Sequence, residues 1–206
     1  MTKLIVFDMD GVIFEDTDFW MNLHKAFGTY AEGKKLTEKY LKTDYSKLVD
    51  EVVGRLWKEK DAKPYYDLVK KAKYVSGAKE LFEELHKRGY KTAVISSGPS
   101  DLALRAKYDL GIDYVHTNEL VIQKGKVTGE FIWPIGADRK QVILRNLCDK
   151  NNVFYKDCIA VVHATSDIKM AKTAGFAIGF NPEKEIEKYC KVIIRKKDLR
   201  EVIKYI

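Results

Sequence analysis

The strongest constraint on the fold of this chain is a series of short, uninterrupted apolar runs rich in branched side chains. The runs span residues 4–7, 92–95, 159–162, 176–178 and 192–194. Continuous apolar runs, unlike alternating ones, are typical of strands buried on both faces, as in parallel sheets. Helical patterns lie between them, for example Leu81, Phe82 and Leu85 with Gly89 as a stop. This alternation predicts an α/β fold built on a doubly wound parallel sheet.

The stretch 15–74 breaks this alternation. Apolar residues recur in it every four positions, as at Phe19, Leu23 and Phe27, and we predict three or four amphipathic helices. The insert follows the first strand directly, and open α/β sheets bind ligands at the carboxyl ends of their strands. We therefore expect a small helical cap over the site, acting as a lid. The predicted parts are a catalytic core, residues 1–14 and 75–206, and the cap, residues 15–74.

Two further local patterns belong to the core. Residues 120–131 predict a β-hairpin that turns at Lys124-Gly125-Lys126. Asp138, with Gln141 three residues later, resembles a capping box at the start of a helix that continues through Leu147.

The charge of the chain favours an anionic partner. Its 37 Lys and Arg against 30 Asp and Glu give a formal net charge of +7, and a positive field attracts anions such as phosphate esters. The densest basic block, residues 195–197, is too short to favour nucleic acid. We therefore predict a small phosphate ester as the partner and no nucleic acid.

Cysteine usage and the N-terminal run bear on location. Cys148, Cys158 and Cys190 are odd in number, far apart and without a CxxC pair. This pattern favours core thiols in a reducing compartment over a disulfide framework or a zinc site. The apolar run 4–7 is too short for a signal peptide or a membrane span. We predict a cytoplasmic protein that does not contact a membrane.

The sharpest chemical signal is Asp8-Met9-Asp10-Gly11, directly after the first apolar run. Two neighbouring carboxylates at the end of a strand are costly to desolvate unless a cation lies close. One carboxylate can attack phosphorus while the other handles the proton of the leaving group. Short acidic turns are common, so the motif alone is also consistent with a strand-ending turn.

Two weaker signals follow at later junctions between strand and helix. Ser96-Ser97-Gly98-Pro99 closes the second run and opens a helix, where a hydroxyl and free amides can seat an anion. The same residues also suit a simple helix cap. Lys140 lies in the first turn of a helix, where a cation opposes the helix dipole. It is suited to bridging a phosphoryl group and a carboxylate, or it is an ordinary surface lysine.

The last signal is His163-Ala164-Thr165-Ser166-Asp167, after the run 159–162. Ser166 or Asp167 can cap the following helix, so taken alone the segment is also consistent with a structural role. The setting of all the signals decides between these interpretations. Each lies at or near a strand-to-helix junction, and in a doubly wound sheet these junctions converge on one crevice.

These motifs resemble those of the haloacid dehalogenase-like phosphohydrolases, and within them the phosphoserine phosphatase branch. The family pattern is DxDx(T/V), then Ser or Thr, then Lys, then GDxxxD, and the resemblance runs essentially the whole length of the chain. It implies a Rossmann-like core and a phosphomonoesterase that forms an aspartyl-phosphate on Asp8. Asp10 would be the general acid and then the base, and an acid at this position favours phosphoryl transfer over dehalogenation.

The resemblance also implies roles for the other residues. Ser96 would bind phosphate oxygens with help from Ser97 and Gly98, Lys140 would hold Asp8, and Ser166 would face the substrate. Mg²⁺ would be organised by Asp8, the Asp10 carbonyl and the acids of the last motif.

The chain departs from this pattern at the metal site. His163 stands where the family has a metal-binding Asp, whereas Asp167 matches the second acid of the motif. Three outcomes are distinct: His163 ligates a softer divalent ion, a protonated His163 partly replaces the ion, or Mg²⁺ binds weakly without it. We favour the third, because the remaining acids are intact.

A second departure concerns the substrate. The branch holds the serine ammonium with an acid in the flap and its carboxylate with a cap Arg. Here no flap acid is clearly in register, and Arg55 is the candidate cap residue. A phosphoserine-like small ester is the predicted substrate. The alternatives are a phosphate-binding relative disabled by His163, and a phosphomutase.

Overall fold

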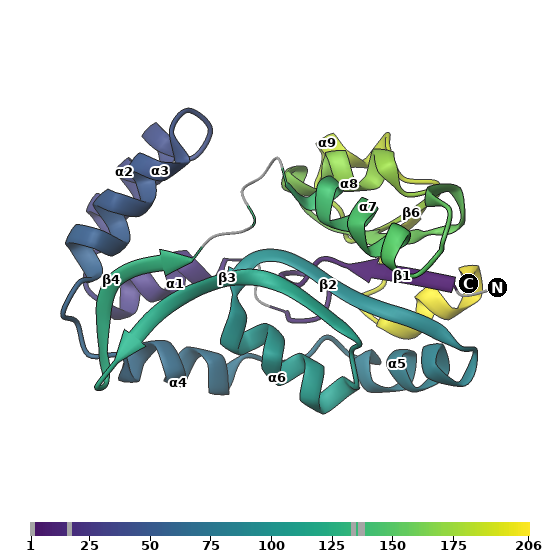
Figure 1. Cartoon of the computed structure of the whole chain (residues 1–206), viewed down its shortest axis with the longest axis horizontal. Coiled ribbons are helices and arrows are strands. Elements are labelled where there is room, and N and C mark those ends of the chain that lie inside the picture. Colours follow the sequence, from purple (N-terminus) through teal and green to yellow (C-terminus); the bar gives the residue numbers. More distant parts are fainter. Residues whose placement is uncertain (1–2, 16–17, 133–134, 136–138) are drawn as a thin grey trace.

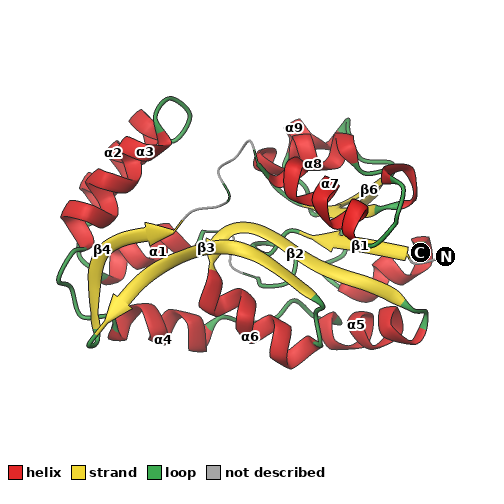
Figure 2. Ribbon diagram, in the orientation of Figure 1, coloured by secondary structure: helices red, strands yellow, loops and turns green. Residues whose placement is uncertain are grey.

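The sheet and its connections form the frame of the molecule. The computed structural model describes residues 3–15, 18–132, 135 and 139–206. In this part of the chain a seven-stranded sheet has the order β4-β3-β2-β1-β5-β6-β7 (Figures 1 and 2). Neighbours are parallel except for the antiparallel pair β3–β4. The strands are β1 (Lys3–Phe7), β2 (Tyr90–Pro99), β3 (Tyr114–Gln123), β4 (Lys126–Ile132), β5 (Ile159–Val162), β6 (Phe176–Phe180) and β7 (Val192–Ile194).

Helices cover both faces of the sheet, which confirms the predicted doubly wound fold. One face packs against α5 (Ala78–Lys87), α6 (Ser100–Leu110) and the 3₁₀ segment η4 (Leu199–Tyr205). The other packs against α7 (Lys140–Lys150), α8 (Ile168–Thr173) and α9 (Lys184–Glu187). In Figure 1, α5 and α6 lie below the sheet and α7, α8 and α9 lie above it. Shorter 3₁₀ segments, η2 (Tyr155–Asp157) and η3 (Thr165–Asp167), flank β5.

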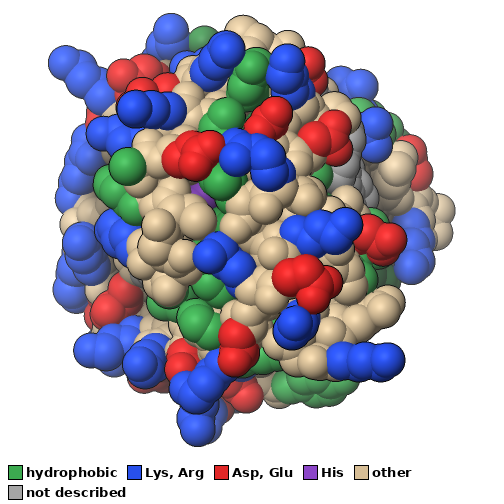
Figure 3. All heavy atoms as spheres, turned by 90° about the vertical axis from the view of Figure 1, so that its left-hand side faces the viewer, with side chains coloured by type: hydrophobic (Ala, Val, Ile, Leu, Met, Phe, Trp, Pro, Cys, Tyr) green, Lys and Arg blue, Asp and Glu red, His purple; other side chains and the backbone are tan. Residues whose placement is uncertain are grey.

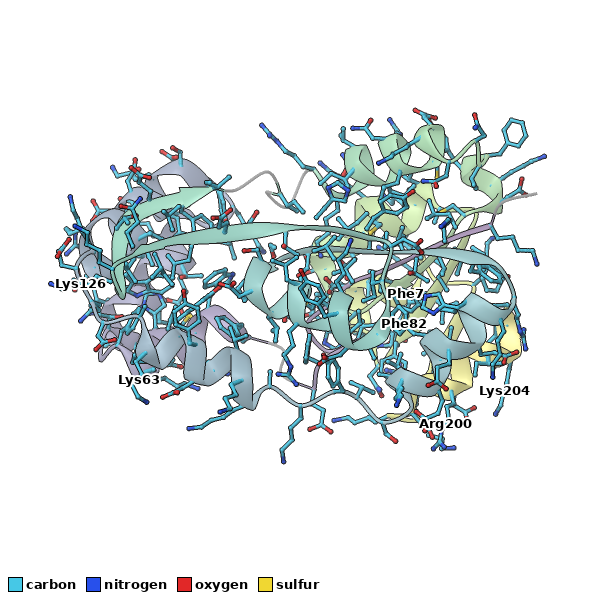
Figure 4. All side chains as sticks on the ribbon, turned by 60° about the horizontal axis from the view of Figure 1, so that its bottom comes forward. Phe7, Lys63, Phe82, Lys126, Arg200 and Lys204 are labelled. Carbon is cyan, nitrogen blue, oxygen red and sulfur yellow. The ribbon has the colours of Figure 1, made fainter. Side chains whose placement is uncertain are left out.

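The central strand β1 explains why its sequence is apolar throughout. Ile5 and Phe7 belong to the core on one face, and Leu4 and Val6 to the core on the other. The rings of Phe7 and Phe82 are 4.9 Å apart at their centroids and are both fully buried (Figure 4). Burying one such ring contributes about 1.5–3 kcal/mol. β1 is therefore anchored from both sides just before it ends at Asp8.

The helices predicted after β1 are present, and the cap that we expect them to form stays a prediction. Its helices lie at the left end of the view in Figure 1. Leu48, Val52 and Leu56, which recur every four positions, fall on an α-helix that continues as a π-helix. The first cap helix begins at Phe19 and the last ends at Lys71, and the domain limits at 15 and 74 stay predictions. The cap elements are α1 (Phe19–Ala26), α2 (Tyr30–Tyr40), α3 (Tyr45–Val49), the π-helix η1 (Asp50–Trp57) and α4 (Lys63–Lys71).

The predicted hairpin is present and joins the cap to the sheet. Lys124 and Gly125 both have positive φ, 50° and 75°, as a two-residue type I′ turn requires. The hairpin pairs with the cap through backbone hydrogen bonds from Glu59 N to Val127 O (2.9 Å) and from Ala62 N to Gly125 O (2.8 Å). Lys63 and Lys126 accordingly lie at the same end of the molecule in Figure 4. The hairpin therefore braces the cap against the edge of the sheet.

Of two local expectations, the first agrees with the structure and the second does not. The Ser96 motif closes β2, which ends at Pro99, and α6 begins directly after it at Ser100. The N-cap residue of α7 is Arg139, whose side chain makes no capping hydrogen bond. Gln141 Oε1 is buried without a hydrogen bond. The predicted capping box is thus not seen at Gln141, and Asp138 lies outside the described residues.

The surface agrees with a scattered distribution of charge on the face that Figure 3 displays. There Lys and Arg side chains are interspersed with Asp and Glu, and no large area of one sign is visible. Among the described residues, no helix is both long enough and apolar enough to cross a bilayer.

Candidate active site

One cavity at the carboxyl ends of the central strands collects most of the predicted site residues. Its volume is about 330 Å³. β1, β2 and β5 end beside it, because they are neighbours in the sheet and run in the same direction. The lining residues are Asp8, Asp10, Asp18, Ser96, Ser97, Lys140, His163, Ala164, Ser166 and Glu183.

At the base of the cavity, Lys140 bridges two buried carboxylates. Its Nζ lies 2.9 Å from Asp8 Oδ1 and 2.5 Å from Asp167 Oδ1, and all three side chains are at most 5% exposed. Asp167 is held in turn by its second oxygen, which accepts hydrogen bonds from His163 N (3.0 Å) and Ala164 N (3.1 Å). Lys140 is therefore a buried bridging residue, and Asp167 also fixes the loop after β5.

Electrostatics of this cluster make Asp8 unusually basic. Burial, and secondly the negative charge of Asp167, raise the pKa of Asp8 to about 6, with Lys140 opposing both. Burial disfavours the charge on Lys140, but the Asp167 and Asp8 carboxylates outweigh it and raise the pKa of Lys140. Lys140 therefore stays charged while Asp8 titrates close to neutral pH.

The end of β2 forms the opposite wall. Ser96 is 1% exposed, and its Oγ accepts a hydrogen bond from Gly98 N (3.0 Å). The Gly98 N–H, which is expected to help bind phosphate oxygens, thus donates to Ser96 in this structure. A Cβ atom at position 98 would lie 2.4 Å from Met9 Cε and 3.0 Å from Asp10 Oδ2. A side chain at position 98 would displace the ends of the Met9 and Asp10 side chains, so the glycine leaves room for Asp10 and Ser96 on one wall.

His163 lies against the other side of the DxDG turn. Its Nδ1 is 3.2 Å from the carbonyl oxygen of Phe180, which can only accept, so Nδ1 carries a hydrogen and Nε2 is the atom left to act as a donor or a ligand. A Cβ at Gly11 would lie 2.7 Å from the His163 Cδ2 atom. Gly11, with φ of 74°, therefore permits both the tight turn and the imidazole beside it.

Sequence reasoning missed two acids of the cavity. Asp18 caps α1 by accepting a hydrogen bond from Met21 N (3.2 Å). It belongs to the flap, where the sequence alone identifies no acid as the one that would face the substrate. Glu183 follows β6, and its Oε2 accepts from Thr165 N (2.7 Å). The rule that strand ends converge applies to β6 as well, and it would have found Glu183 if used there.

Three predicted site residues, Gly98, Asp167 and Arg55, are not among the lining residues. Gly98 and Asp167 bond to residues that are, through Ser96 and Lys140, whereas Arg55 does not. Its side chain is half exposed and pairs with Glu32 (2.6 Å) and Glu51 (2.8 Å), all within the cap. In this arrangement Arg55 ties α2 to η1. Its role toward a substrate carboxylate stays a prediction, which these contacts do not favour.

The donors at this cavity suit a divalent ion of the oxygen-preferring kind. Four of the lining residues carry carboxylates, and Lys140 supplies one ammonium group. A phosphate dianion added to this set would be repelled unless a further cation were present. Among the described residues, however, no three His, Cys, Asp or Glu side chains already have the arrangement of a metal site. The fit therefore rests on carboxylate and carbonyl oxygens around Asp8 and Asp10.

Known proteins are similar to this chain in sequence and in fold. The family of haloacid dehalogenase-like hydrolases matches residues 2–175. Phosphoserine phosphatase of Methanocaldococcus jannaschii is 30% identical, over 99% of this chain and 97% of its own length. That of Archaeoglobus fulgidus is 33% identical, over 96% of this chain and 58% of its own length.

Solved structures agree. A substrate-bound phosphoserine phosphatase superposes with a TM-score of 0.88 at 30% identity, covering 100% of this chain and 99% of the other. A phospho-aspartyl intermediate analogue of phosphoserine phosphatase gives 0.87 at the same identity and coverage. The chain belongs to the haloacid dehalogenase-like hydrolase family.

Proposed function

We propose that this protein is a phosphomonoesterase that hydrolyses a small phosphate ester through an aspartyl-phosphate on Asp8. The observation that carries the proposal is the buried Lys140 bridge between Asp8 and Asp167, at a cavity that Asp8, Lys140 and Ser96 line together. The matching relatives and solved structures that are phosphoserine phosphatases support the same chemistry. A phosphoserine-like metabolite is the first candidate substrate.

In the proposed reaction Lys140 holds Asp8 through Oδ1, which leaves Oδ2 to attack phosphorus. Lys140 and the Ser96 hydroxyl stabilise charge on the phosphoryl oxygens. Asp10 donates a proton to the departing alkoxide oxygen and then accepts one from the water that releases phosphate. The phosphate–leaving-group bond breaks in the first half and the Asp8–phosphate bond in the second.

We propose Mg²⁺ as the ion, held by the Asp8 carboxylate and the Asp10 carbonyl, with Asp167 supporting its water. Such an ion would neutralise phosphate charge and fix the orientation of the phosphoryl group. The cytoplasmic location stays a prediction; all three cysteines are free thiols, as a reducing compartment leaves them.

The test is a phosphate-release assay over small phosphate esters, run separately with Mg²⁺, Mn²⁺, Ni²⁺ and Zn²⁺. We expect release from several esters, phosphoserine among them. Isomerisation of a phosphosugar without release would indicate a mutase. Binding of esters without release or isomerisation would indicate a phosphate-binding protein.

The rate should depend on pH through Asp8. Only the carboxylate form attacks, so kcat/KM should fall on the acid side; burial raises the pKa of Asp8 to about 6 in the metal-free protein, and bound Mg²⁺ would shift this acid limb to lower pH. Asp167→Asn removes a negative neighbour and should move this acid limb to lower pH. Initial rates between pH 4.5 and 8 measure the acid limb of both proteins. If the acid limb of Asp167→Asn lies at the same pH as that of the parent, or higher, Asp8 is not the group that titrates.

His163→Asp should raise the affinity for Mg²⁺ and the rate at low Mg²⁺. A carboxylate offers the hard oxygen donor that Mg²⁺ prefers, which imidazole does not. Asn has the shape of Asp without its charge, so His163→Asn should show no gain in Mg²⁺ affinity. Calorimetric Mg²⁺ binding without substrate, together with rates against Mg²⁺ concentration, compares the three proteins. A parent that already saturates at low Mg²⁺, or equal behaviour of the Asp and Asn variants, would refute weak binding at His163.

A further inference from the structure

The peptide unit between Ser97 and Gly98 is held at both ends. Its N–H donates to Ser96 Oγ (3.0 Å). Its carbonyl accepts two hydrogen bonds, from Trp20 Nε1 (3.0 Å) and from Asn118 Nδ2 (3.2 Å). A peptide unit is planar, so fixing the carbonyl also fixes the direction of the N–H.

This arrangement sets the role of the Ser96 hydroxyl. A hydroxyl has one hydrogen to donate and two lone pairs that accept. The Gly98 N–H occupies an acceptor position on Ser96 Oγ, which leaves the O–H free to rotate and donate to an anion in the cavity that Ser96 lines. Donors aimed in advance at a phosphoryl oxygen need no reorganisation during the reaction.

The two partners of the carbonyl come from different parts of the molecule. Asn118 is fully buried on β3, and its amide also bonds Ile135 N (3.2 Å) and Ile135 O (3.1 Å), five residues before Lys140. Trp20 comes from α1 of the cap, 77 residues away in sequence from Ser97. The first contact belongs to the core, whereas the second exists only when the cap is seated on it.

The Trp20 indole is clamped by aromatic rings of several elements. Its ring centroid is 6.0 Å from that of Trp57 in η1 and 5.4 Å from that of Phe131 in β4. Phe19 packs edge-on at 5.5 Å. The position of the indole N–H therefore reports how cap and hairpin are packed together.

We propose that Trp20 is a positioning residue, which orients the Ser96 hydroxyl through the Ser97–Gly98 peptide and so couples the seating of the cap to phosphate binding. The inference rests on the proposed function for its catalytic consequence. Its consequence for phosphate affinity is independent of turnover.

The test is Trp20→Phe, which keeps an aromatic ring and removes the N–H donor. A lost hydrogen bond of ordinary strength corresponds to about a fivefold to tenfold effect. We expect the Kd of inorganic phosphate, measured by calorimetry with Mg²⁺ present, to rise by that factor and kcat to fall by a similar one. Tyr65→Phe is the matched control: it also keeps an aromatic ring and removes one hydrogen bond between cap and core, from the Tyr65 hydroxyl in α4 to Asp101 Oδ2 in α6 (2.8 Å). That variant should lose thermal stability and keep both phosphate affinity and kcat.

A double-mutant cycle separates positioning from general loosening of the site. If Trp20 acts through Ser96, then Trp20→Phe should change phosphate affinity little in a Ser96→Ala background. Equal effects in both backgrounds, or equal effects of Trp20→Phe and Tyr65→Phe on phosphate affinity, would overturn the inference. Phosphate binding without ester hydrolysis by the parent would instead refute the proposed function and leave the affinity comparison valid.

Discussion

Asp8→Asn is expected to lower the rate of phosphate release by at least about four orders of magnitude, the scale seen when a covalent nucleophile is lost. An amide oxygen is a poor nucleophile and cannot form the acyl phosphate. The fold should survive, because Lys140 keeps its second partner, Asp167, at 2.5 Å. Release rates with phosphoserine and with an aryl phosphate, at saturating Mg²⁺, measure the loss.

The same variant should be more stable than the parent when the metal is chelated. In the fold the pKa of Asp8 is raised from 3.8 to about 6, so the folded state binds the proton more tightly than the unfolded chain does. Stability from this group is therefore present at low pH and lost as the pH rises through about 6. At pH 7.5 Asp8→Asn should gain on the order of 1–3 kcal/mol, and at pH 4 almost nothing. A stability loss at pH 7.5 would show that Asp8 is structural.

Lys140→Met is expected to have the largest effect on stability. It leaves the Asp8 and Asp167 carboxylates buried without their cation, which costs about 3–5 kcal/mol near neutral pH. The cost should shrink at pH 5, where Asp8 becomes protonated. Activity should fall at least about a hundredfold, because a donor to the phosphoryl oxygens is lost as well. Chemical denaturation at pH 8 and pH 5 measures the first effect.

Lys91→Met is the matched control for Lys140→Met. Lys91 forms an ion pair of similar length with Asp113 (2.7 Å), but its side chain is 47% exposed. Exposed pairs contribute about 0–1 kcal/mol, so Lys91→Met should change little at either pH. Similar losses of stability in both variants would mean that the buried Lys140 bridge contributes no more to stability than an exposed ion pair.

The fold and the centre of the site follow from local sequence patterns. Apolar runs buried on both faces identify the central strands, and polar residues directly after them, such as Asp8, Ser96 and His163, must share one edge of the sheet. The glycine of the DxDG turn has a direct structural reason, since its φ is positive and the His163 ring occupies the Cβ position.

The parts that could not be predicted depend on contacts between distant elements. β3 carries Asn118, a polar residue that can be buried because its amide bonds Ser97 and Ile135. Trp20 has the spacing of an ordinary core aromatic, and only the assembled cap brings its N–H to Ser97. Arg55 is of a residue type that often binds anions, but its guanidinium is paired with Glu32 and Glu51 of the cap.

The central claim is that Asp8 carries the phosphoryl group during turnover. Enzyme quenched in acid during turnover and treated with borohydride should contain homoserine at residue 8, because borohydride reduces an acyl phosphate and spares a free carboxylate. Peptide mass spectrometry locates the change, and enzyme quenched without substrate is the control. We predict homoserine at residue 8 in the substrate-treated sample alone. Continued phosphate release with residue 8 unmodified, or with the phosphoryl group on another side chain, would contradict the account.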